Sequence, residues 1–88
     1  LISMTKAYAK ELAAKNIRVN ALLPGLTKTD FSKALFDIEE IHKYVIEQIP
    51  MRRHAEPHEM AGAVLYLVSD AASFTTGICL TCDGGYLA

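Results

Sequence analysis

The chain has 88 residues, which allows one domain or part of one. A hydrophobic content of 51% with 22% charged residues excludes an intrinsically disordered polymer. The net charge of −1 gives no electrostatic basis for binding nucleic acid or an anionic membrane, and no apolar run reaches the roughly 18–20 residues of a transmembrane helix. The first residue is Leu1 and not Met, so we expect part of a longer protein. No basic, apolar leader is visible, so we expect a cytoplasmic protein.

The first two predicted elements are a helix and a buried strand. Leu1 to Ala14 carries apolar residues at helical spacing, and Asn16 favours the left-handed conformation that ends a helix. Ile17 to Leu23 is a near-continuous apolar run, typical of a parallel strand covered on both faces. Asn20 interrupts this run, and we interpret it as a structural hydrogen-bonding residue, with a catalytic role as the less favoured alternative.

The strand stops at Pro24-Gly25 and opens into a threonine-rich loop. Proline cannot donate to a strand ladder, and glycine permits a backbone that side chains would forbid. Ligands of open α/β sheets bind beyond the carboxyl ends of the strands. The stretch from Arg18 to Asp30 is therefore a candidate binding site.

The middle of the chain predicts a loop, a helix and a basic connector. Leu26 to Phe36 is a loop with one short helical turn, and Asp37 opens a helix that Ile49-Pro50 stops. Asp37 and Glu40 form a capping box, and His42 faces outward on this helix. The connector that follows contains Arg52 and Arg53, which either bind a phosphate or, as we favour, are solvated.

A third helix and a second strand complete the predicted pattern. Pro57 occupies a first helical position, and the helix ends near Ser69-Asp70, with Leu65 and Tyr66 as a second apolar side. Ile78 to Cys82 is the second strand. Two strands joined through helices predict a right-handed parallel crossover. Two parallel strands alone would leave their edges uncovered, so we expect the other strands of the sheet upstream.

Metal and redox motifs are incomplete. His58-Glu59 begins like a zinc-protease motif, but Gly62 stands where the second histidine is required. The three histidines fall in different segments, so we predict no metal site. Cys79 and Cys82 are three apart on a strand and face opposite sides, which favours two free, buried thiols and a reducing compartment.

Several short motifs, each weak alone, occur in one order through the whole chain. Together they resemble the C-terminal part of the classical short-chain dehydrogenase/reductase family, in particular its 3-oxoacyl-carrier-protein reductase and glucose dehydrogenase-like members. The matching segments are Thr5-Lys6-Ala7, Lys10-Glu11-Leu12-Ala13, Ile17-Arg18-Val19-Asn20-Ala21, Pro24-Gly25-Leu26-Thr27-Lys28-Thr29, Ile49-Pro50-Met51-Arg52-Arg53, Glu56-Pro57, Leu67-Val68-Ser69-Asp70-Ala71-Ala72-Ser73, Thr76-Gly77 and Asp83-Gly84-Gly85.

This resemblance implies an α/β fold. Residues 1–88 would be the C-terminal part of a single NAD(P)-binding, Rossmann-like domain, contributing the last two strands and flanking helices of a doubly wound parallel sheet. It also implies NAD or NADP as cofactor, although the residue that separates the two is absent here.

The family resemblance places the cofactor-binding residues in the Pro-Gly motif. Pro24, Gly25 and Leu26 would bring the backbone to the nicotinamide, the Thr27 N–H would donate to its carboxamide, and the Thr29 hydroxyl would bind the carboxamide or the diphosphate. The family's tyrosine and lysine, four residues apart, are not found in this chain, so no catalytic residue is assigned and the pair is expected upstream. Arg52 stands where the family often has glycine.

The resemblance also implies hydride transfer between nicotinamide and a secondary alcohol or ketone, and a homotetramer. Phe31, Leu35 and Phe36 either line an apolar substrate pocket or pack the variable loop onto the body of the protein. The alternative function is a non-catalytic oligomerisation module, a structural remnant of a reductase.

Overall fold

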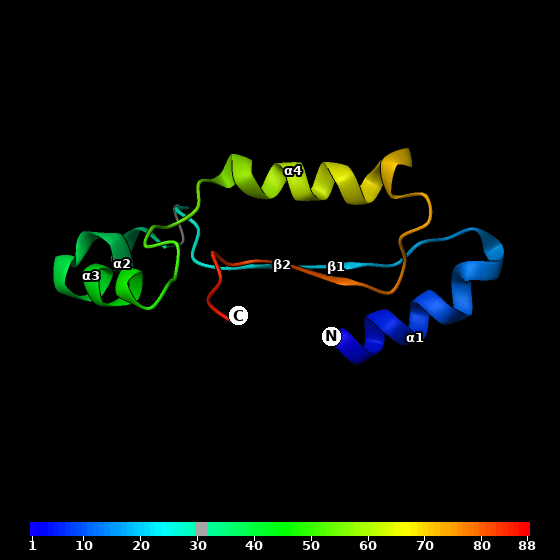
Figure 1. Cartoon of the computed structure of the whole chain (residues 1–88), viewed down its shortest axis with the longest axis horizontal. Coiled ribbons are helices and arrows are strands. Elements are labelled where there is room, and N and C mark those ends of the chain that lie inside the picture. The colour runs from blue at the N-terminus through cyan, green and yellow to red at the C-terminus, as the bar shows by residue number, and fades with distance from the viewer. Residues whose placement is uncertain (30–31) are drawn as a thin grey trace.

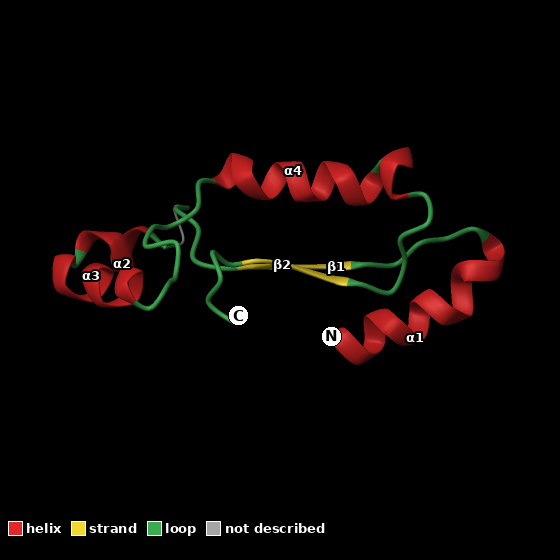
Figure 2. Cartoon of the chain, viewed as in Figure 1, coloured by secondary structure: helices red, strands yellow, loops and turns green. Residues whose placement is uncertain are grey.

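The computed structural model describes residues 1–29 and 32–88, and its centre is a pair of parallel strands (Figure 1). β1 (Ala21–Pro24) pairs with β2 (Cys79–Cys82) in a register that sets Ala21 opposite Cys79 and Pro24 opposite Cys82. Helix α4 (Pro57–Val68) lies along one side of the strands and α1 (Ile2–Leu12) on the other (Figure 2). This arrangement confirms the predicted α/β class with a parallel crossover.

The first helix ends close to where the sequence predicts. α1 is followed by one 3₁₀ turn, η1 (Ala13–Lys15), and Asn16 adopts the predicted left-handed conformation with φ of 60°. Ala9 is buried where α1 approaches Gly77, since a Cβ atom placed on that glycine would lie 3.3 Å from the Ala9 Cβ. Small residues on both sides thus let α1 pack against the chain that leads into β2.

The first strand is shorter than predicted, because it begins at Ala21 rather than Ile17. The preceding residues run beside the loop that leads into β2 and bond to it irregularly. The Val19 N–H donates to the Thr76 hydroxyl at 3.0 Å, and the Val19 carbonyl accepts from the Gly77 N–H at 2.8 Å. One of these bonds uses a side chain, so no regular ladder forms there.

Asn20 has the structural role that the sequence predicts. Its side-chain amide donates to the Thr75 carbonyl at 3.1 Å, and its Oδ1 accepts from the Ile78 N–H at 3.1 Å. Both ends of the amide therefore join the approach to β1 to the approach to β2.

The predicted capping box at Asp37 is wrong. Asp37 is the last residue of the short helix α2 (Lys33–Asp37), and α3 (Glu39–Glu47) begins after Ile38 without a side-chain cap. The extended backbone of Ile38 separates the two helices, so Asp37 lies one residue too early to cap α3. Glu39 and Glu40 in the first turn instead place negative charge near the helix N-terminus.

The third predicted helix is confirmed. α4 starts with Pro57 at its first turn and ends at Val68, followed by the 3₁₀ turn η2 (Asp70–Ala72). The predicted second apolar side is also present, because Leu65 is 67% exposed and Tyr66 is 41% exposed, and Val68, expected on the first apolar face, is exposed as well. One face of α4 packs on the strands and the other is uncovered in this chain.

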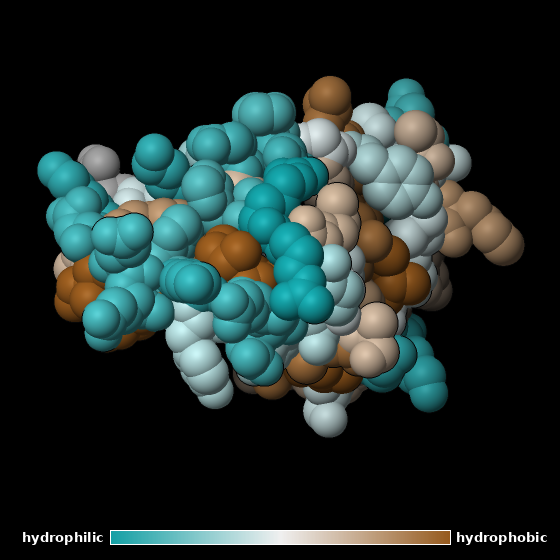
Figure 3. Space-filling model, turned by 60° about the vertical axis from the view of Figure 1, so that its left-hand side comes forward, coloured by the Kyte–Doolittle hydropathy of each residue, from teal (hydrophilic) through white to brown (hydrophobic). Residues whose placement is uncertain are grey.

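The described residues bury few apolar side chains. The buried hydrophobic residues are Ala9, Ala21, Ile49 and Ala72, and apolar groups reach the surface in several places (Figure 3). The radius of gyration is 15.7 Å, whereas a compact domain of this length has about 12 Å. Among the described residues no helix is both long and apolar enough to span a bilayer.

Arg52 lies in the left-handed region with φ of 58°, so this position favours glycine. We predict that Arg52→Gly is more stable than Arg52→Ala by about 1 kcal/mol, because a Cβ atom is disfavoured in this conformation. Thermal unfolding of the full-length protein measures the difference. Both variants lose the guanidinium that donates to the Glu47 carbonyl at the end of α3, so the pair isolates the backbone term. Equal stability of the two variants contradicts the prediction.

Candidate functional site

The carboxyl ends of β1 and β2 meet at a very close contact. The Gly25 N–H donates to the Cys82 carbonyl at 2.8 Å. A Cβ atom on Gly25 would lie 2.6 Å from the Asp83 Cα and 2.8 Å from its Cβ, closer than real side chains come. Gly25 is not among the glycines with positive φ, so it is required for space and not for a special backbone conformation.

Asp83 organises the turn that follows β2. Its two carboxylate oxygens accept from the N–H groups of Gly85 at 3.0 Å and Leu87 at 3.1 Å. Gly84 has φ of +66°, and a Cβ atom there would lie 2.8 Å from the Ile49 side chain. The turn is therefore packed against the end of the α3 segment, and it holds Tyr86 beside the Pro24-Gly25 break.

The backbone after Gly25 leaves two donors, the N–H groups of Leu26 and Thr27, without an acceptor among the described residues. Thr27 forms an isolated parallel bridge with Ala55, through bonds from Lys28 N–H to the Ala55 carbonyl and from Ala55 N–H to the Leu26 carbonyl. These bonds use the neighbours of Thr27, so its own N–H and carbonyl point away from Ala55. The carbonyl accepts from the Ser32 hydroxyl at 2.8 Å, while the N–H has no acceptor among the described residues.

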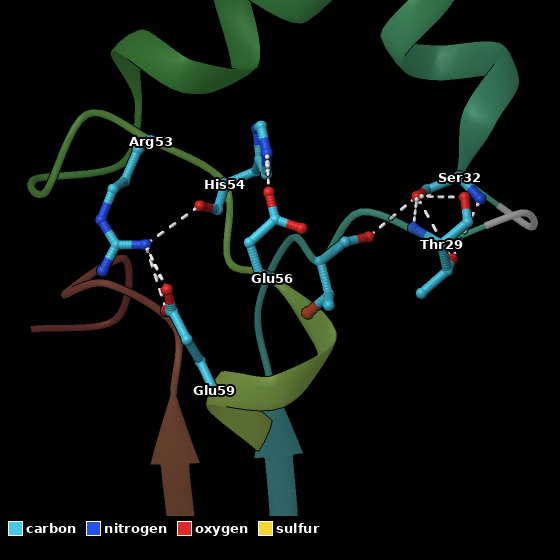
Figure 4. Close-up of polar contacts among 7 residues, drawn as sticks. Thr29, Ser32, Arg53, His54, Glu56 and Glu59 are labelled. Carbon is cyan, nitrogen blue, oxygen red and sulfur yellow. Dashed lines mark hydrogen bonds and ion pairs between the residues drawn. The ribbon is translucent and has the colours of Figure 1, made fainter. Parts of the chain in front are cut away.

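Thr29 is tied to Ser32, a contact that the sequence analysis missed (Figure 4). The Thr29 N–H donates to the Ser32 hydroxyl at 2.9 Å, and the two hydroxyls are 3.3 Å apart. Ser32 precedes α2 and also bonds to Thr27. A serine three residues after a threonine in a loop is a common local turn pattern, and this spacing could have predicted the contact.

A hollow of about 440 Å³ opens beside the predicted cofactor residues. Pro24, Gly25 and Leu26 form one side, so three of the five predicted residues lie together at its edge. The remaining lining residues come from the α3 segment and from the turn after β2: Tyr44, Val45, Gln48, Ile49, Asp83 and Tyr86. Neither tyrosine was expected at this site from the sequence.

Phe36 lies elsewhere, in a packed aromatic cluster. Its ring centroid is 4.7 Å from that of His42 and 4.8 Å from that of His54. The predicted outward position of His42 is wrong, since its Nε2 atom is buried, with no hydrogen-bond partner among the described residues. His54 is 3.2 Å from the Glu56 carboxylate.

The phenyl ring joins α2 to α3 and to the connector before α4, as the packing interpretation expects, and Phe36 also lines an open hollow with Thr29, as the pocket interpretation expects. Phe31 and the Leu35 side chain, for which the same two interpretations were given, lie outside the described residues. Two histidines from different segments do come together here, contrary to the prediction that they are scattered. Even so, no group of three or more metal-ligating side chains forms within residues 1–29 and 32–88.

Arg53 does more than face solvent. Its guanidinium lies 2.8 and 3.1 Å from the Glu59 carboxylate oxygens and donates to the His54 carbonyl at 3.2 Å (Figure 4). The hydrogen bond and positive charge of Arg53 hold the pKa of Glu59 below its usual value, despite an opposing effect of burial. This pair ties the connector to the first turn of α4, while the Arg53 side chain stays about half exposed, in agreement with the favoured interpretation that it is solvated.

The two cysteines are free thiols, as predicted, but they are less buried than expected. Cys79 and Cys82 are half-buried free thiols in β2.

Sequence comparison finds relatives along nearly the whole chain. The family model described as "Enoyl-(Acyl carrier protein) reductase" matches residues 1–87. Dehydrogenase/reductase SDR family member 4 from Oryctolagus cuniculus is 47% identical over 85 residues, which is 97% of this chain and 33% of that protein. The 3-oxoacyl-[acyl-carrier-protein] reductase FabG from Thermotoga maritima is 42% identical, over 97% of this chain and 34% of its own length.

Solved structures give the same picture. A putative 2-deoxy-D-gluconate 3-dehydrogenase from Agrobacterium tumefaciens with bound NADP matches 98% of this chain and 35% of its own, with a TM-score of 0.93 and 40% identity. A 4-hydroxyisoleucine dehydrogenase complexed with NADH also has a TM-score of 0.93, at 30% identity, over 97% of this chain and 35% of its own. The chain thus spans about a third of the length of these relatives.

The Arg53–Glu59 pair gives a prediction for acid pH. A carboxylate whose pKa is lowered in the folded state adds stability at neutral pH and loses that contribution as the pH falls below about 4.5. We expect the stability difference between wild type and Glu59→Gln to shrink from pH 7 to pH 3.5, with urea midpoints of the full-length protein as the measurement. Glu11→Gln, on exposed α1, is the control. A difference that is constant with pH contradicts the prediction.

Proposed function

Because this chain belongs to the short-chain dehydrogenase/reductase family, we propose that residues 1–88 are the C-terminal part of one Rossmann-like, NAD(P)-binding domain. Its parallel strands and its likeness to Rossmann-fold structures agree with that place in the sheet. The small number of buried side chains and the elongated shape also support it, because a complete domain of this size buries more of its surface.

We propose that the whole protein is an oxidoreductase that transfers hydride between a nicotinamide cofactor and a secondary alcohol or ketone. Relatives described as FabG reductases and as a 3α-hydroxysteroid dehydrogenase support this reaction class. Structures with bound NADP or NADH support the cofactor. The nicotinamide ring supplies or accepts the hydride when it is bound.

The free N–H of Thr27 is the observation that carries the proposal. A backbone donor without an acceptor among the described residues, two positions after the Gly25 that borders the hollow, fits the oxygen of a carboxamide. Leu26 and Ala55 fix the direction of this N–H through the bridge on the opposite side of the strand. Pro24, Gly25 and Leu26 would line the ring, and Thr29 would act beside them.

Thr29 has a second task in this arrangement. Its hydroxyl and N–H hold Ser32, which in turn binds the Thr27 carbonyl. Thr29 therefore orients the Thr27 peptide as well as being a candidate ligand itself. No residue of this chain is proposed to act as acid or base, so its part in the reaction is binding and orientation.

A pair of substitutions at Thr27 tests the cofactor site. Thr27→Pro removes the N–H, whereas Thr27→Val keeps it and deletes only the hydroxyl that donates to the Gly25 carbonyl. We expect Thr27→Pro to weaken NADH or NADPH binding about tenfold, the value of one hydrogen bond of roughly 1.4 kcal/mol, and Thr27→Val to change it less than twofold. Calorimetry on the full-length protein measures both.

Cofactor binding that is equal in the two Thr27 variants would count against the site. Failure of the wild-type protein to bind either NADH or NADPH, or to oxidise them with any ketone, would count against the proposed reaction and favour a non-catalytic structural role. Circular dichroism of each variant checks that the proline has not unfolded the loop and its surroundings.

We further propose that the protein assembles as a homotetramer and works in the cytoplasm. Uncovered apolar residues on α4, with Val68 and Leu65 as the most exposed, support an interface on this helix. The free thiols of Cys79 and Cys82 support a reducing compartment.

Substitution at the exposed face of α4 tests the assembly. Leu65→Glu places an unpaired charge on that face, so we expect the dissociation constant of the oligomer to rise more than tenfold. Light scattering after size-exclusion chromatography of the full-length protein measures the mass. Lys43→Glu, on the exposed part of α3, is the control and should leave the mass unchanged. An unchanged mass for Leu65→Glu contradicts an interface on this face.

A further inference from the structure

The hollow beside Pro24 and Gly25 has two aromatic walls. Tyr44 comes from the exposed part of α3 and is 65% exposed, while Tyr86 comes from the turn after β2 and is 60% exposed. The two rings belong to segments about forty residues apart, and both line the same space of about 440 Å³. Val45 and the buried Ile49 add apolar surface between them.

The position of Tyr86 is fixed by the backbone. The Tyr86 N–H donates to the Asp83 carbonyl, and the flanking N–H groups of Gly85 and Leu87 donate to the Asp83 carboxylate. The Asp83 main chain in turn lies against Gly25. The backbone that carries Tyr86 is therefore held next to the proposed nicotinamide position by a short run of contacts, and the residue lines the hollow.

The lining residues that this chain supplies to the hollow disfavour an anionic ligand. No lysine, arginine or histidine is among its described lining residues, and the one charged residue is Asp83. A bound carboxylate or phosphate would have no counter-charge on these walls and would lie near a negative group. The hydroxyls of the two tyrosines and the amide of Gln48 can exchange hydrogen bonds with a neutral ligand.

We propose that this hollow binds the body of a neutral cyclic ketone or alcohol, with Tyr44 and Tyr86 as the residues that determine specificity. The proposal rests on the proposed function, because it names the substrate class of that reaction. Aromatic faces pack well against the flat sides of saturated or unsaturated rings. The ring would lie between the tyrosines, with its carbonyl directed toward the Pro24-Gly25 edge.

Steady-state kinetics of the full-length protein tests this assignment with two ketones. The probes are 2-decalone, a neutral fused-ring ketone, and 5-ketogluconate, an anion, each with NADH or NADPH. We expect kcat/KM to be at least tenfold higher for 2-decalone. Tyr44→Ala and Tyr86→Ala should each lower it about tenfold, mainly through KM, and leave the KM of the cofactor within twofold.

Two control variants sharpen the result. Lys43→Ala changes the neighbouring exposed residue of α3 and should leave kcat/KM for 2-decalone unchanged. Tyr44→Phe keeps the ring and should retain most of the activity that Tyr44→Ala loses. Preference for 5-ketogluconate, or alanine variants with unchanged kinetics, overturns the proposal. So does a loss that appears in the KM of the cofactor, because the tyrosines would then line the nicotinamide site.

The outcomes separate this proposal from the proposed function. Wild-type protein that binds NADH or NADPH but fails to reduce 2-decalone overturns the assignment of the hollow and leaves the cofactor site standing. Protein that binds neither nicotinamide cofactor overturns both. Binding measured by the change in NADH fluorescence distinguishes these cases without relying on turnover.

Discussion

The structure depends on the contact between the ends of its two strands. Gly25 lies so close to Asp83 that a Cβ atom would come within 2.6 Å of the Asp83 main chain. This approach brings the loop after β1 and the turn after β2 to the same edge. Asp83 then uses its carboxylate on the turn, while Gly84 admits the Ile49 side chain. The proposed cofactor residues and the aromatic hollow are both consequences of that one close approach.

Local signals made much of the fold predictable. A left-handed Asn16, a proline at the start of α4 and apolar runs for two parallel strands follow from residue preferences that act within a few positions. The role of Asn20 was also predictable, because a buried amide requires partners and the neighbouring strand supplies them. The start of β1 was not predictable, because the Val19 N–H bonds to Thr76, almost sixty residues away.

Contacts between distant segments account for what the sequence did not predict. Phe36, His42 and His54 belong to three segments, and no spacing rule indicates that their rings meet. Tyr44 appears as one exposed residue of an amphipathic helix, and Tyr86 as part of a tail, until the turn at Asp83 brings both to one hollow. The backbone part of the site, which the Pro-Gly motif marks, was therefore predictable from the sequence. The side chains that line the hollow were not.

The well-defined loops at the strand ends and the small number of buried apolar side chains have different causes in this chain. Hydrogen bonds between segments thirty to sixty residues apart hold the loop, the connector before α4 and the final turn in place, and these bonds lie within the described residues. Burial is different, because alanines make up most of the buried apolar residues while α1 and α4 keep large apolar side chains exposed. Hydrogen bonds specify geometry but add little net stability, whereas burial supplies most of it. The shape of the proposed cofactor edge is thus specified by hydrogen bonds within this chain, whereas any surface that covers α1 and α4 would add stability by burying their exposed apolar side chains.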